Sequence, residues 1–434
     1  MTGGARSRSI ISRRLAVALA LAGAVASRAG AATAEPAKPG NEPGEKGSAE
    51  LVIERADGGR SDDRTRSAAE RGDARSQFQL GLAYESGETV ARDYREAVRW
   101  YQKAAEQGEA DAQNHLAFLY TAKLGVDHDY AKAVGWFREA AERGHPRAQL
   151  NLGSMYFWGM GVARDWAESA AWTLRAAEYG LAEARYALGY KYDHGEGVPE
   201  DPAQAAVWYR KAAEQGHADS QLRIGYLYAT ARGVARDDAQ AVLWYRRAAE
   251  QGHSRAQLRL GSAYGTGLGV PRDVTRAADW FRRAAERGEP IAQANLGFMY
   301  LSGEGVPVEA GEAARWLRLA AEQGVAEAQF RLGALYALGT GVRVDRKESL
   351  DWIRRAAQLG HVRAQSALGV ALAYGGATAR DSVESYMWLS LSAEAGIRES
   401  AKLLAELAPD LTADQLAEAE ARVEAWRKKR ATAR

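Results

Sequence analysis

Tryptophan recurs every 36 residues along most of the chain. Nine tryptophans keep this interval without an insertion: Trp100, Trp136, Trp172, Trp208, Trp244, Trp280, Trp316, Trp352 and Trp388. A closing glycine keeps the same step from Gly108 to Gly396, and an acidic residue does so from Asp93 to Asp381. A fixed period of this size is typical of arrays in which each short unit packs only on its neighbours. The sequence therefore predicts one array of nine repeats over residues 74–397.

Each repeat has the pattern of two helices. In the first half a small, an aliphatic and an aromatic residue share one helical face, as Ala148, Leu152 and Tyr156 do. A G-x-G-V stretch then interrupts the pattern. The second half starts at the recurrent acid, with a Glu or Gln three residues later, as in Asp165 and Glu168, which is the spacing of a capping box. We therefore expect a helix-turn-helix pair in each repeat, with the nine tryptophans filling the space between helices.

Both ends of the array carry sequences that predict caps. Residues 62–73 match the end of a repeat and indicate an N-terminal half-repeat. Residues 398–430 are expected to form C-terminal capping helices, because Thr412 and Gln415 have capping-box spacing. One apolar stripe follows on the same predicted helix: Leu416, Ala419, Val423 and Trp426. These segments would cover the open ends of the array.

The repeated pattern A-x-x-x-L-G-x-x-Y-x-x-G-x-G-V-x-x-D-x-x-x-A-x-x-W-x-x-x-A-A-x-x-G resembles the Sel-one-like repeat family, 36-residue relatives of tetratricopeptide repeats. The fourth repeat matches almost throughout: Ala184, Leu188, Gly189, Tyr192, Gly195, Gly197, Val198, Asp201, Ala205, Trp208, Ala212, Ala213 and Gly216. The resemblance implies an all-α fold, a right-handed α-solenoid (superhelix) with the first helices on its concave side. Ala117 and Lys123 replace glycines of the second repeat, so we expect an altered inter-helix turn there.

Residues 1–34 have the features of a secretory signal peptide. A basic start precedes an apolar stretch from Leu15 to Ala26, and an A-x-A sequence ends at Ala34. The apolar stretch is too short to span a hydrocarbon core of about 30 Å. We expect cleavage after Ala34, with Ala31 as the alternative, and a periplasmic or secreted protein with no stable membrane insertion. Residues 35–61 are expected to be a disordered linker.

Several classes of chemistry find no support in the sequence. The lack of cysteine excludes disulfides, zinc-thiolate sites and thiol catalysis, and HExxH, GxSxG and SxxK motifs do not occur. The basic termini leave a net charge near −8 between them, which does not suit nucleic-acid binding. We therefore predict no catalytic residue, no cofactor and no metal.

Two polar residue types also follow the repeat. Histidines share one phase directly after the closing glycine, and we expect them in turns: His145, His217, His253 and His361. Glutamines share another phase and are expected to hydrogen-bond the loops between repeats: Gln77, Gln113, Gln149, Gln221, Gln257, Gln293, Gln329 and Gln365. Residues that keep the period serve the fold, so recognition is sought where the repeats differ.

The positions that vary between repeats predict a partner site on the first helices. Aromatics with arginine dominate binding hot spots, and these types occupy the variable positions Phe118, Trp158, Tyr190, Arg223, Tyr226 and Phe298. The third repeat departs most from the pattern, with Phe157, Trp158, Met160 and Trp166. We expect a groove for a protein or peptide between the second and fifth repeats. The alternative is that these aromatics pad contacts between repeats.

The leading interpretation is an exported, non-enzymatic scaffold or adaptor that binds a partner protein or peptide. The family resemblance implies a role in envelope complexes, in regulating sensor kinases or in exopolysaccharide secretion. One alternative is a cell-wall or β-lactam hydrolase, although the relatives linked to that chemistry are rich in cysteine. Another is a saccharide-binding module, which aromatic residues also serve.

Overall fold

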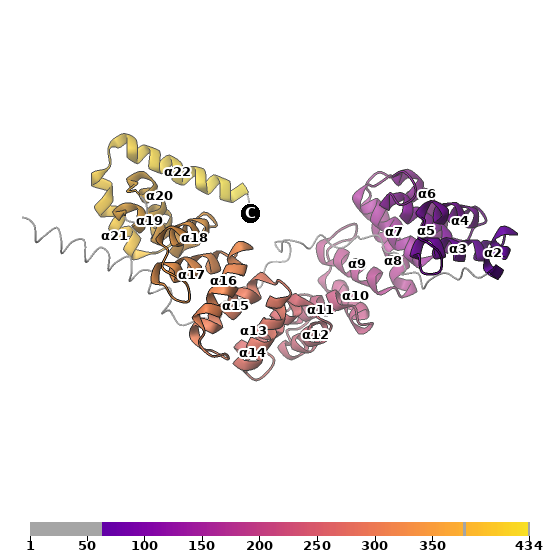
Figure 1. The fold of residues 1–434 in the computed structure, drawn as a ribbon, viewed down its shortest axis with the longest axis horizontal. Helices are drawn as coiled ribbons and strands as arrows, with labels where there is room; N and C mark the ends of the chain where they lie inside the picture. Colours follow the sequence, from indigo (N-terminus) through magenta and orange to yellow (C-terminus); the bar gives the residue numbers. More distant parts are fainter. Residues whose placement is uncertain (1–62, 376–378, 433–434) are drawn as a thin grey trace, which may run out of the picture. The chain divides into compact units, whose positions relative to one another are not determined.

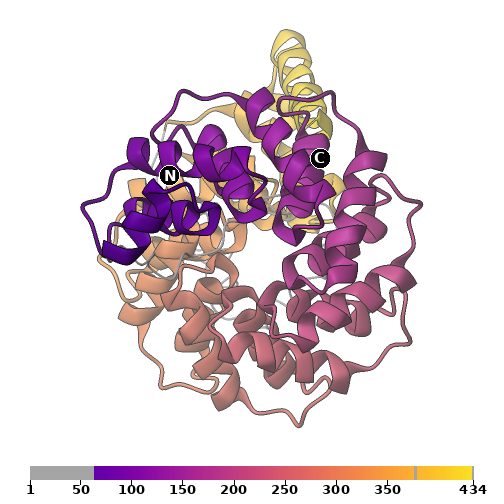
Figure 2. The same ribbon diagram turned by 90° about the vertical axis from the view of Figure 1, so that its right-hand side faces the viewer.

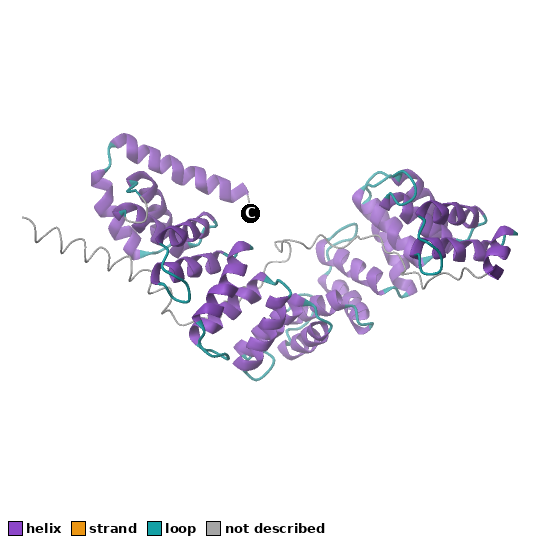
Figure 3. Ribbon diagram, in the orientation of Figure 1, coloured by secondary structure: helices purple, strands orange, loops and turns teal. Residues whose placement is uncertain are grey.

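The computed structural model describes residues 63–375 and 379–432. The expectations for residues 1–34 and 35–61, a signal peptide and a linker, lie outside the described residues, as does residue 62 of the predicted N-terminal cap. Over the described part of the chain all regular structure is helical, with no strand (Figure 3). This confirms the predicted all-α fold class.

The chain divides into two compact bodies. The N-terminal body has described residues 63–251, and the C-terminal body has described residues 252–375 and 379–432. In each body every helix of the repeats packs against the next one along the chain, which is the contact pattern of a solenoid. Figures 1 and 2 show the helix pairs of each body following one another in chain order.

The N-terminal body starts with a short helix, α2 (Asp63–Glu70), in the place of the predicted half-repeat. The first helices of its repeats are α3 (Ala74–Ser86), α5 (Ala110–Ala122), α7 (Pro146–Trp158), α9 (Ala182–His194) and α11 (Ala218–Thr230). The second helices are α4 (Tyr94–Glu106), α6 (Tyr130–Glu142), α8 (Trp166–Tyr179), α10 (Pro202–Glu214) and α12 (Asp238–Glu250). Five predicted helix pairs are thus present in this body.

The C-terminal body holds four further pairs and the C-terminal cap. Its first helices are α13 (Ser254–Thr266), α15 (Pro290–Ser302), α17 (Ala326–Leu338) and α19 (Val362–Tyr374). Its second helices are α14 (Val274–Glu286), α16 (Ala310–Glu322), α18 (Arg346–Gln358) and α20 (Ser382–Glu394). The cap consists of α21 (Arg398–Leu407), a 3₁₀ turn η1 (Ala408–Asp410) and α22 (Ala413–Thr432).

Helix α22 covers the last pair through its apolar stripe. Val423 is buried, and the Trp426 ring packs edge-on against Trp388 with 6.4 Å between ring centroids. Its N-terminus is the predicted capping box: Thr412 N donates to Gln415 Oε1, and Gln415 N donates to Thr412 Oγ1. The helix therefore removes from water a face that a further repeat would otherwise cover.

Polar residues of the repeat pattern cap the helix ends. The Asp165 carboxylate accepts a hydrogen bond from Glu168 N at 3.0 Å at the start of α8, as predicted for the second helices. The phased histidines do the same for first helices, because His145 Nδ1 accepts from Ala148 N at 3.0 Å. These histidines are therefore helix N-caps, a more specific role than the turn position expected from the sequence.

The phased glutamines also stabilise helix ends rather than loops. Gln113 Nε2 donates to the carbonyl of Ala105, in the last turn of the preceding second helix, at 3.1 Å. Other glutamines of this phase donate in the same way to the carbonyl eight residues earlier in the chain. Gln149, for example, donates to the carbonyl of Ala141. The expectation of a loop partner is corrected, because the acceptor is an orphan carbonyl at a helix C-terminus.

Close contact between repeats explains the second glycine of the G-x-G-V stretch. A Cβ at Gly197 would lie 1.8 Å from the carbonyl oxygen of Trp166, the first residue of the previous second helix. Glycine here also has φ of 76°, in the left-handed region. The inter-helix turn of one repeat thus rests on the first turn of the second helix before it.

The second repeat does not have the altered turn that its sequence suggested. Lys123 takes φ of 58° at the C-cap of α5, the conformation that Gly159 takes at the C-cap of α7. Ala231 does the same at the end of α11, with φ of 57°. The repeat packing therefore holds non-glycine residues in the left-handed region, which costs about 1–2 kcal/mol per residue.

The nine phased tryptophans are buried or half-buried, as expected of structural residues. A cation from the same helix covers many of the rings: Lys211 Nζ lies 4.0 Å from the Trp208 ring centroid, and the Arg247 guanidinium lies 4.4 Å from that of Trp244. Basic residues of the second helices thus lie over these tryptophan rings.

Candidate functional site

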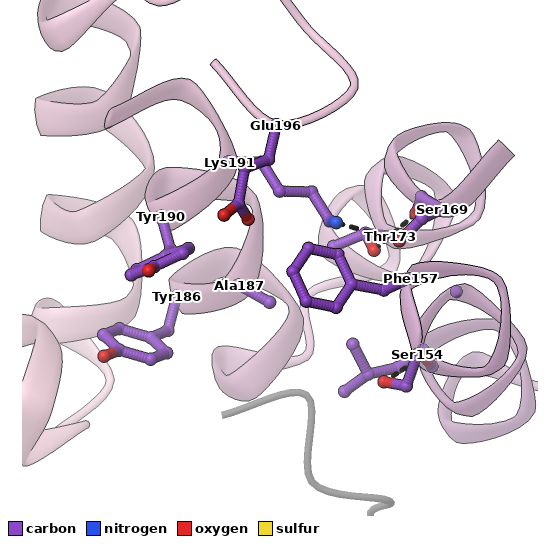
Figure 4. A pocket seen from close by; sticks show the side chains of 11 residues that line it. Ser154, Phe157, Ser169, Thr173, Tyr186, Ala187, Tyr190, Lys191 and Glu196 are labelled. Atoms are coloured by element: carbon purple, nitrogen blue, oxygen red, sulfur yellow. Dashed lines mark hydrogen bonds between the residues drawn. The ribbon is translucent and has the colours of Figure 1, made fainter. Parts of the chain in front are cut away.

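A pocket opens between α7, α8 and α9, where the third repeat meets the fourth (Figure 4). Its lining residues are Leu150, Gly153, Ser154, Phe157, Ser169, Thr173, Tyr186, Ala187, Tyr190, Lys191 and Glu196. The interior volume is about 30 Å³, which admits the end of a side chain but not a whole polypeptide segment. All these residues belong to the N-terminal body.

The pocket exists because the third repeat lacks bulk at one core position. The residues at this phase in the other repeats are Tyr101, Phe137, Tyr209, Tyr245, Phe281, Leu317, Ile353 and Leu389. The third repeat has Thr173, whose hydroxyl donates to the Ser169 carbonyl at 2.7 Å. Ser154 similarly donates to the carbonyl of Leu150, four residues back on its own helix. Two small hydroxyl residues therefore leave space that larger side chains fill in most other repeats.

Lys191 is buried in the wall of this pocket. Its phase is apolar in the other repeats: Ala83, Leu119, Met155, Leu227, Ala263, Met299, Leu335 and Ala371. The side chain is 5% exposed, and Nζ donates to Ser169 Oγ at 2.8 Å and lies 4.6 Å from the centroid of the Phe157 ring. Burial lowers the pKa of Lys191 to about 8, against the opposing effect of Glu196.

Glu196 follows α9 in the inter-helix turn of the fourth repeat. Among the described residues its Oε2 atom has no hydrogen-bond partner although it is buried. Burial raises the pKa of this carboxyl, and the nearby Lys191 and His194 oppose that rise. In Figure 4 the Lys191 ammonium lies toward Ser169 and Thr173, whereas the Glu196 carboxylate lies on the side of Tyr190. The pocket thus offers a cation and an anion that do not hydrogen-bond each other.

An aromatic cluster adjoins the pocket on the side of α7. Phe157 contacts Trp158 edge-to-face at 4.9 Å and stacks on Trp166 at 6.4 Å between centroids. Trp158 is 43% exposed and Trp166 is 46% exposed. Exposed tryptophans that share a contact with a pocket residue are typical of recognition surfaces.

The residues predicted to bind a partner do not all lie together. Tyr190 lines the pocket and stacks on His194, and Trp158 reaches the pocket through Phe157. Phe118 is half-buried against the core of the first two repeats, and Tyr226 is half-buried beside the core of the fourth and fifth. Arg223 is also partly buried.

Phe298 belongs to a different environment from the other predicted residues. It lies in the C-terminal body, is 8% exposed and forms part of a core cluster, with the Arg331 guanidinium 5.5 Å from its ring centroid. The burial of this ring in a core cluster is what the alternative interpretation, packing between repeats, expects. A hydrophobic ring at a variable position becomes buried where the side chains of the neighbouring repeat are large enough to cover it.

Most pocket residues escaped the sequence prediction, which sought exposed aromatics and not polar residues at core phases. Lys191 at an apolar phase is such a departure, and so are Ser169, where most repeats have alanine, and Thr173. The signal was present in the alignment of the repeats with one another. A buried lysine costs free energy unless it is paired, so its occurrence at a core phase points to a function.

Within residues 63–375 and 379–432 no group of three or more His, Cys, Asp or Glu side chains could hold a metal ion. In the same part of the chain, no helix has the length and apolar character needed to cross a bilayer.

The fold and the site define a helical repeat protein with a side-chain pocket between two repeats. The family model for the Sel1 repeat matches residues 74–109, 110–145, 146–180, 182–217, 218–253, 254–289, 290–325, 326–361 and 362–397. The chain therefore belongs to the Sel1 repeat family, as its repeated pattern predicted. Proteins built from this repeat are generally scaffolds for protein–protein interactions.

Two solved structures are similar over most of this chain. A protective antigen from uropathogenic Escherichia coli with an SLR fold is 31% identical; the match covers 87% of this chain and 95% of that one, with a TM-score of 0.50. A Sel1 repeat protein from Oxalobacter formigenes is 38% identical, over 69% of this chain and 88% of that one, with a TM-score of 0.57. No curated protein sequence matches significantly.

Proposed function

We propose that this protein is an exported, non-enzymatic scaffold or adaptor that binds a partner protein or peptide. Binding takes place at the surface formed by the third and fourth repeats, around the end of α7 and the start of α8. The observation that carries the proposal is the pair of exposed tryptophans, Trp158 and Trp166, in contact with Phe157 at the edge of the pocket. Burying such rings against a partner releases water from a large apolar area at low cost in side-chain entropy.

The finer parts of the proposal rest on the sequence. Export follows from the signal-peptide pattern of residues 1–34, and a role in envelope signalling or polysaccharide secretion follows from the family resemblance. A saccharide-binding module stays the second candidate, because the pocket combines aromatic walls with hydrogen-bonding groups.

The test uses two variants of the full chain. Trp158→Ala with Tyr190→Ala removes one ring of the exposed cluster and one wall of the pocket. Tyr179→Ala is the matched control, because Tyr179 is 74% exposed and ends α8, about 20 Å along the helix from Trp166. Partners captured by each protein are compared after far-UV circular dichroism has established that both variants are folded.

The proposal predicts that the double variant loses its partner, with affinity at least about a hundredfold lower, while the control binds like the wild type. A folded double variant that captures the same partner with unchanged affinity would contradict it. Binding of glycan fragments with a change in tryptophan fluorescence, and no protein partner, would favour the saccharide module instead.

A further inference from the structure

We propose that the pocket between the third and fourth repeats binds a side-chain carboxamide, that of an asparagine or glutamine on a partner peptide. The inference rests on the proposed function, since it names the group that a peptide bound beside Trp158 and Trp166 would insert. Four observations carry it: the partners of Lys191, the vacant acceptor on Glu196, the internal bonds of the pocket hydroxyls and the size of the space.

Lys191 has donors to spare inside the pocket. An ammonium group carries three N–H donors, and among the described residues Ser169 Oγ is its one hydrogen-bond partner. The side chain is 5% exposed, so bulk water reaches it poorly. Folding already carries the free-energy cost of removing this ammonium group from water. A ligand that presents an acceptor would therefore gain a hydrogen bond without adding that cost.

Glu196 supplies the complementary acceptor. Its Oε2 atom is buried without a hydrogen-bond partner in the described part of the chain. A ligand that presents a donor at this point would remove an unfavourable buried oxygen. The pocket therefore favours a ligand with one acceptor near Lys191 and one donor near Glu196.

Charge excludes the ionic side chains. A carboxylate ligand would face the Glu196 carboxylate and would find few further donors, because the Thr173 and Ser154 hydroxyls donate to carbonyls of their own helices. A cationic ligand would meet the Lys191 ammonium, which already lies 4.6 Å from the centroid of the Phe157 ring. The lysine and the glutamate balance each other, so a neutral group is favoured.

Shape selects the carboxamide among neutral groups. It is planar and holds a carbonyl acceptor and an N–H₂ donor, so it offers one group to Lys191 and the other to Glu196, and its flat faces match the Phe157 and Tyr190 rings that line the pocket. The interior of about 30 Å³ receives the end of a side chain. A backbone amide is flanked by chain on both sides and does not enter such a pocket.

The experiment selects peptides from a randomised display library on the full-length wild-type protein and on Lys191→Met and Glu196→Gln variants. We expect the wild type to enrich peptides with Asn or Gln at one fixed position. A synthetic peptide from that set should bind about tenfold more weakly to either variant, and changing its Asn or Gln to Leu or Glu should weaken wild-type binding to a similar extent. Lys211→Met, on an exposed lysine of α10, is the control and should bind normally.

Three outcomes would overturn the inference. Enriched peptides without a fixed Asn or Gln, or peptides that bind Lys191→Met as well as the wild type, would show that the pocket takes another group while leaving the proposed function intact. No enrichment of any peptide would count against both proposals. Competition by oligosaccharides carrying acetamido groups, with no peptide selected, would assign the pocket to a sugar.

Discussion

Two neighbouring interfaces of the N-terminal body solve the same packing problem differently. Between the fourth and fifth repeats the core position holds Tyr209, which is fully buried and lies so close to Gly189 that an added Cβ would be 2.7 Å from its ring. Between the third and fourth repeats the same position holds Thr173, whose Oγ1 would lie 2.9 Å from a Cβ on Gly153 but whose side chain is too small to fill the volume that a larger ring takes, and a pocket remains there. One repeat pattern therefore produces a filled interface and, 36 residues earlier, a pocket.

The charged residues differ in the same way. At the fourth–fifth interface Asp193 is buried, and the Arg232 guanidinium lies 3.2 Å from its Oδ1 and also bonds its carbonyl at 2.7 Å. Burial raises the pKa of Asp193, and Arg232 opposes that rise. At the third–fourth interface Lys191 and Glu196 have no such partnership. Among the described residues, the buried carboxylate of one interface has an arginine partner, although its Oδ1 atom has no hydrogen bond, whereas the lysine and glutamate of the other form no ion pair with each other. We therefore expect the third–fourth interface to be the one used for function.

The largest effect is expected from placing a lysine in the filled interface. Leu227 occupies the phase of Lys191 but is 1% exposed, and Ala205 stands where Ser169 supplies a hydroxyl. Leu227→Lys should lower the free energy of unfolding by about 3–5 kcal/mol, because the ammonium would be buried without a partner. Urea unfolding monitored by circular dichroism measures it, with hydrogen exchange to localise the loss.

The control for this change is Leu243→Lys on α12, since Leu243 is exposed. If Leu227→Lys lowered the free energy of unfolding no more than Leu243→Lys does, the filled interface would tolerate a lysine as well as the surface does, which would contradict the comparison.

Filling the pocket should convert the first interface into the second type. Thr173→Leu with Lys191→Leu copies the seventh and eighth repeats, which carry Leu317 and Leu335 at these phases. The double variant should stay folded, with a stability change below about 2 kcal/mol, and should bind the partner at least about tenfold more weakly although Trp158 is untouched. Isothermal titration measures the affinity, and full binding by the filled protein would remove the pocket from the site.

Removing the lysine alone should stabilise the protein at neutral pH. Lys191→Met eliminates a buried cation of similar length, and we expect a gain of about 1–3 kcal/mol in the free energy of unfolding at pH 7. The folded pKa of about 8 lies below the reference value of 10.5. The unfolded wild type therefore binds more protons between these values, and wild-type stability should rise with pH through this window.

The pH dependence is the sharper part of that test. The Met variant should lack the rise between pH 8 and 10.5, so its advantage over wild type should shrink as pH increases. Lys211→Met should leave the rise unchanged. If the wild type and Lys191→Met had equal stability at pH 7 and the same dependence of stability on pH, the result would contradict an unfavourable burial of the Lys191 ammonium.

The smallest effect concerns the turns of the same two repeats. The fourth repeat ends α9 with Gly195 in the left-handed region, whereas the fifth ends α11 with Ala231 in that region. Ala231→Gly should raise the free energy of unfolding by up to about 1 kcal/mol and the melting temperature slightly. The reason is that the relief of backbone strain in the folded state exceeds the added entropy of the unfolded chain. Ala229→Gly, the same change inside α11, should destabilise by about 1 kcal/mol; a loss of similar size for both would show that Ala231 is not strained.

Much of the fold was predictable, because local residue patterns determine the repeat period, the helix caps and the helix boundaries. Asp165 and Thr412 cap helices as their spacing indicates. Lys123 shows where local reasoning fails, since packing between repeats imposes a conformation that its side chain disfavours. The candidate site was predictable only as a region. Trp158 and Tyr190 marked the third and fourth repeats. The small residue at the phase of Thr173 could be read from the sequence, but that it leaves a pocket beside Lys191 depends on how the helices pack.

Site-specific photocrosslinking tests the central claim most directly. A photoreactive phenylalanine analogue replaces Trp158 in the full chain expressed in its native cell, and a second protein carries it at Tyr179. We predict that position 158 yields a crosslinked adduct with one partner protein, identified by mass spectrometry, that position 179 does not, and that Thr173→Leu with Lys191→Leu abolishes the adduct. Equal adducts from both positions, or an adduct that survives filling of the pocket, would contradict the assignment of the binding site to the third and fourth repeats.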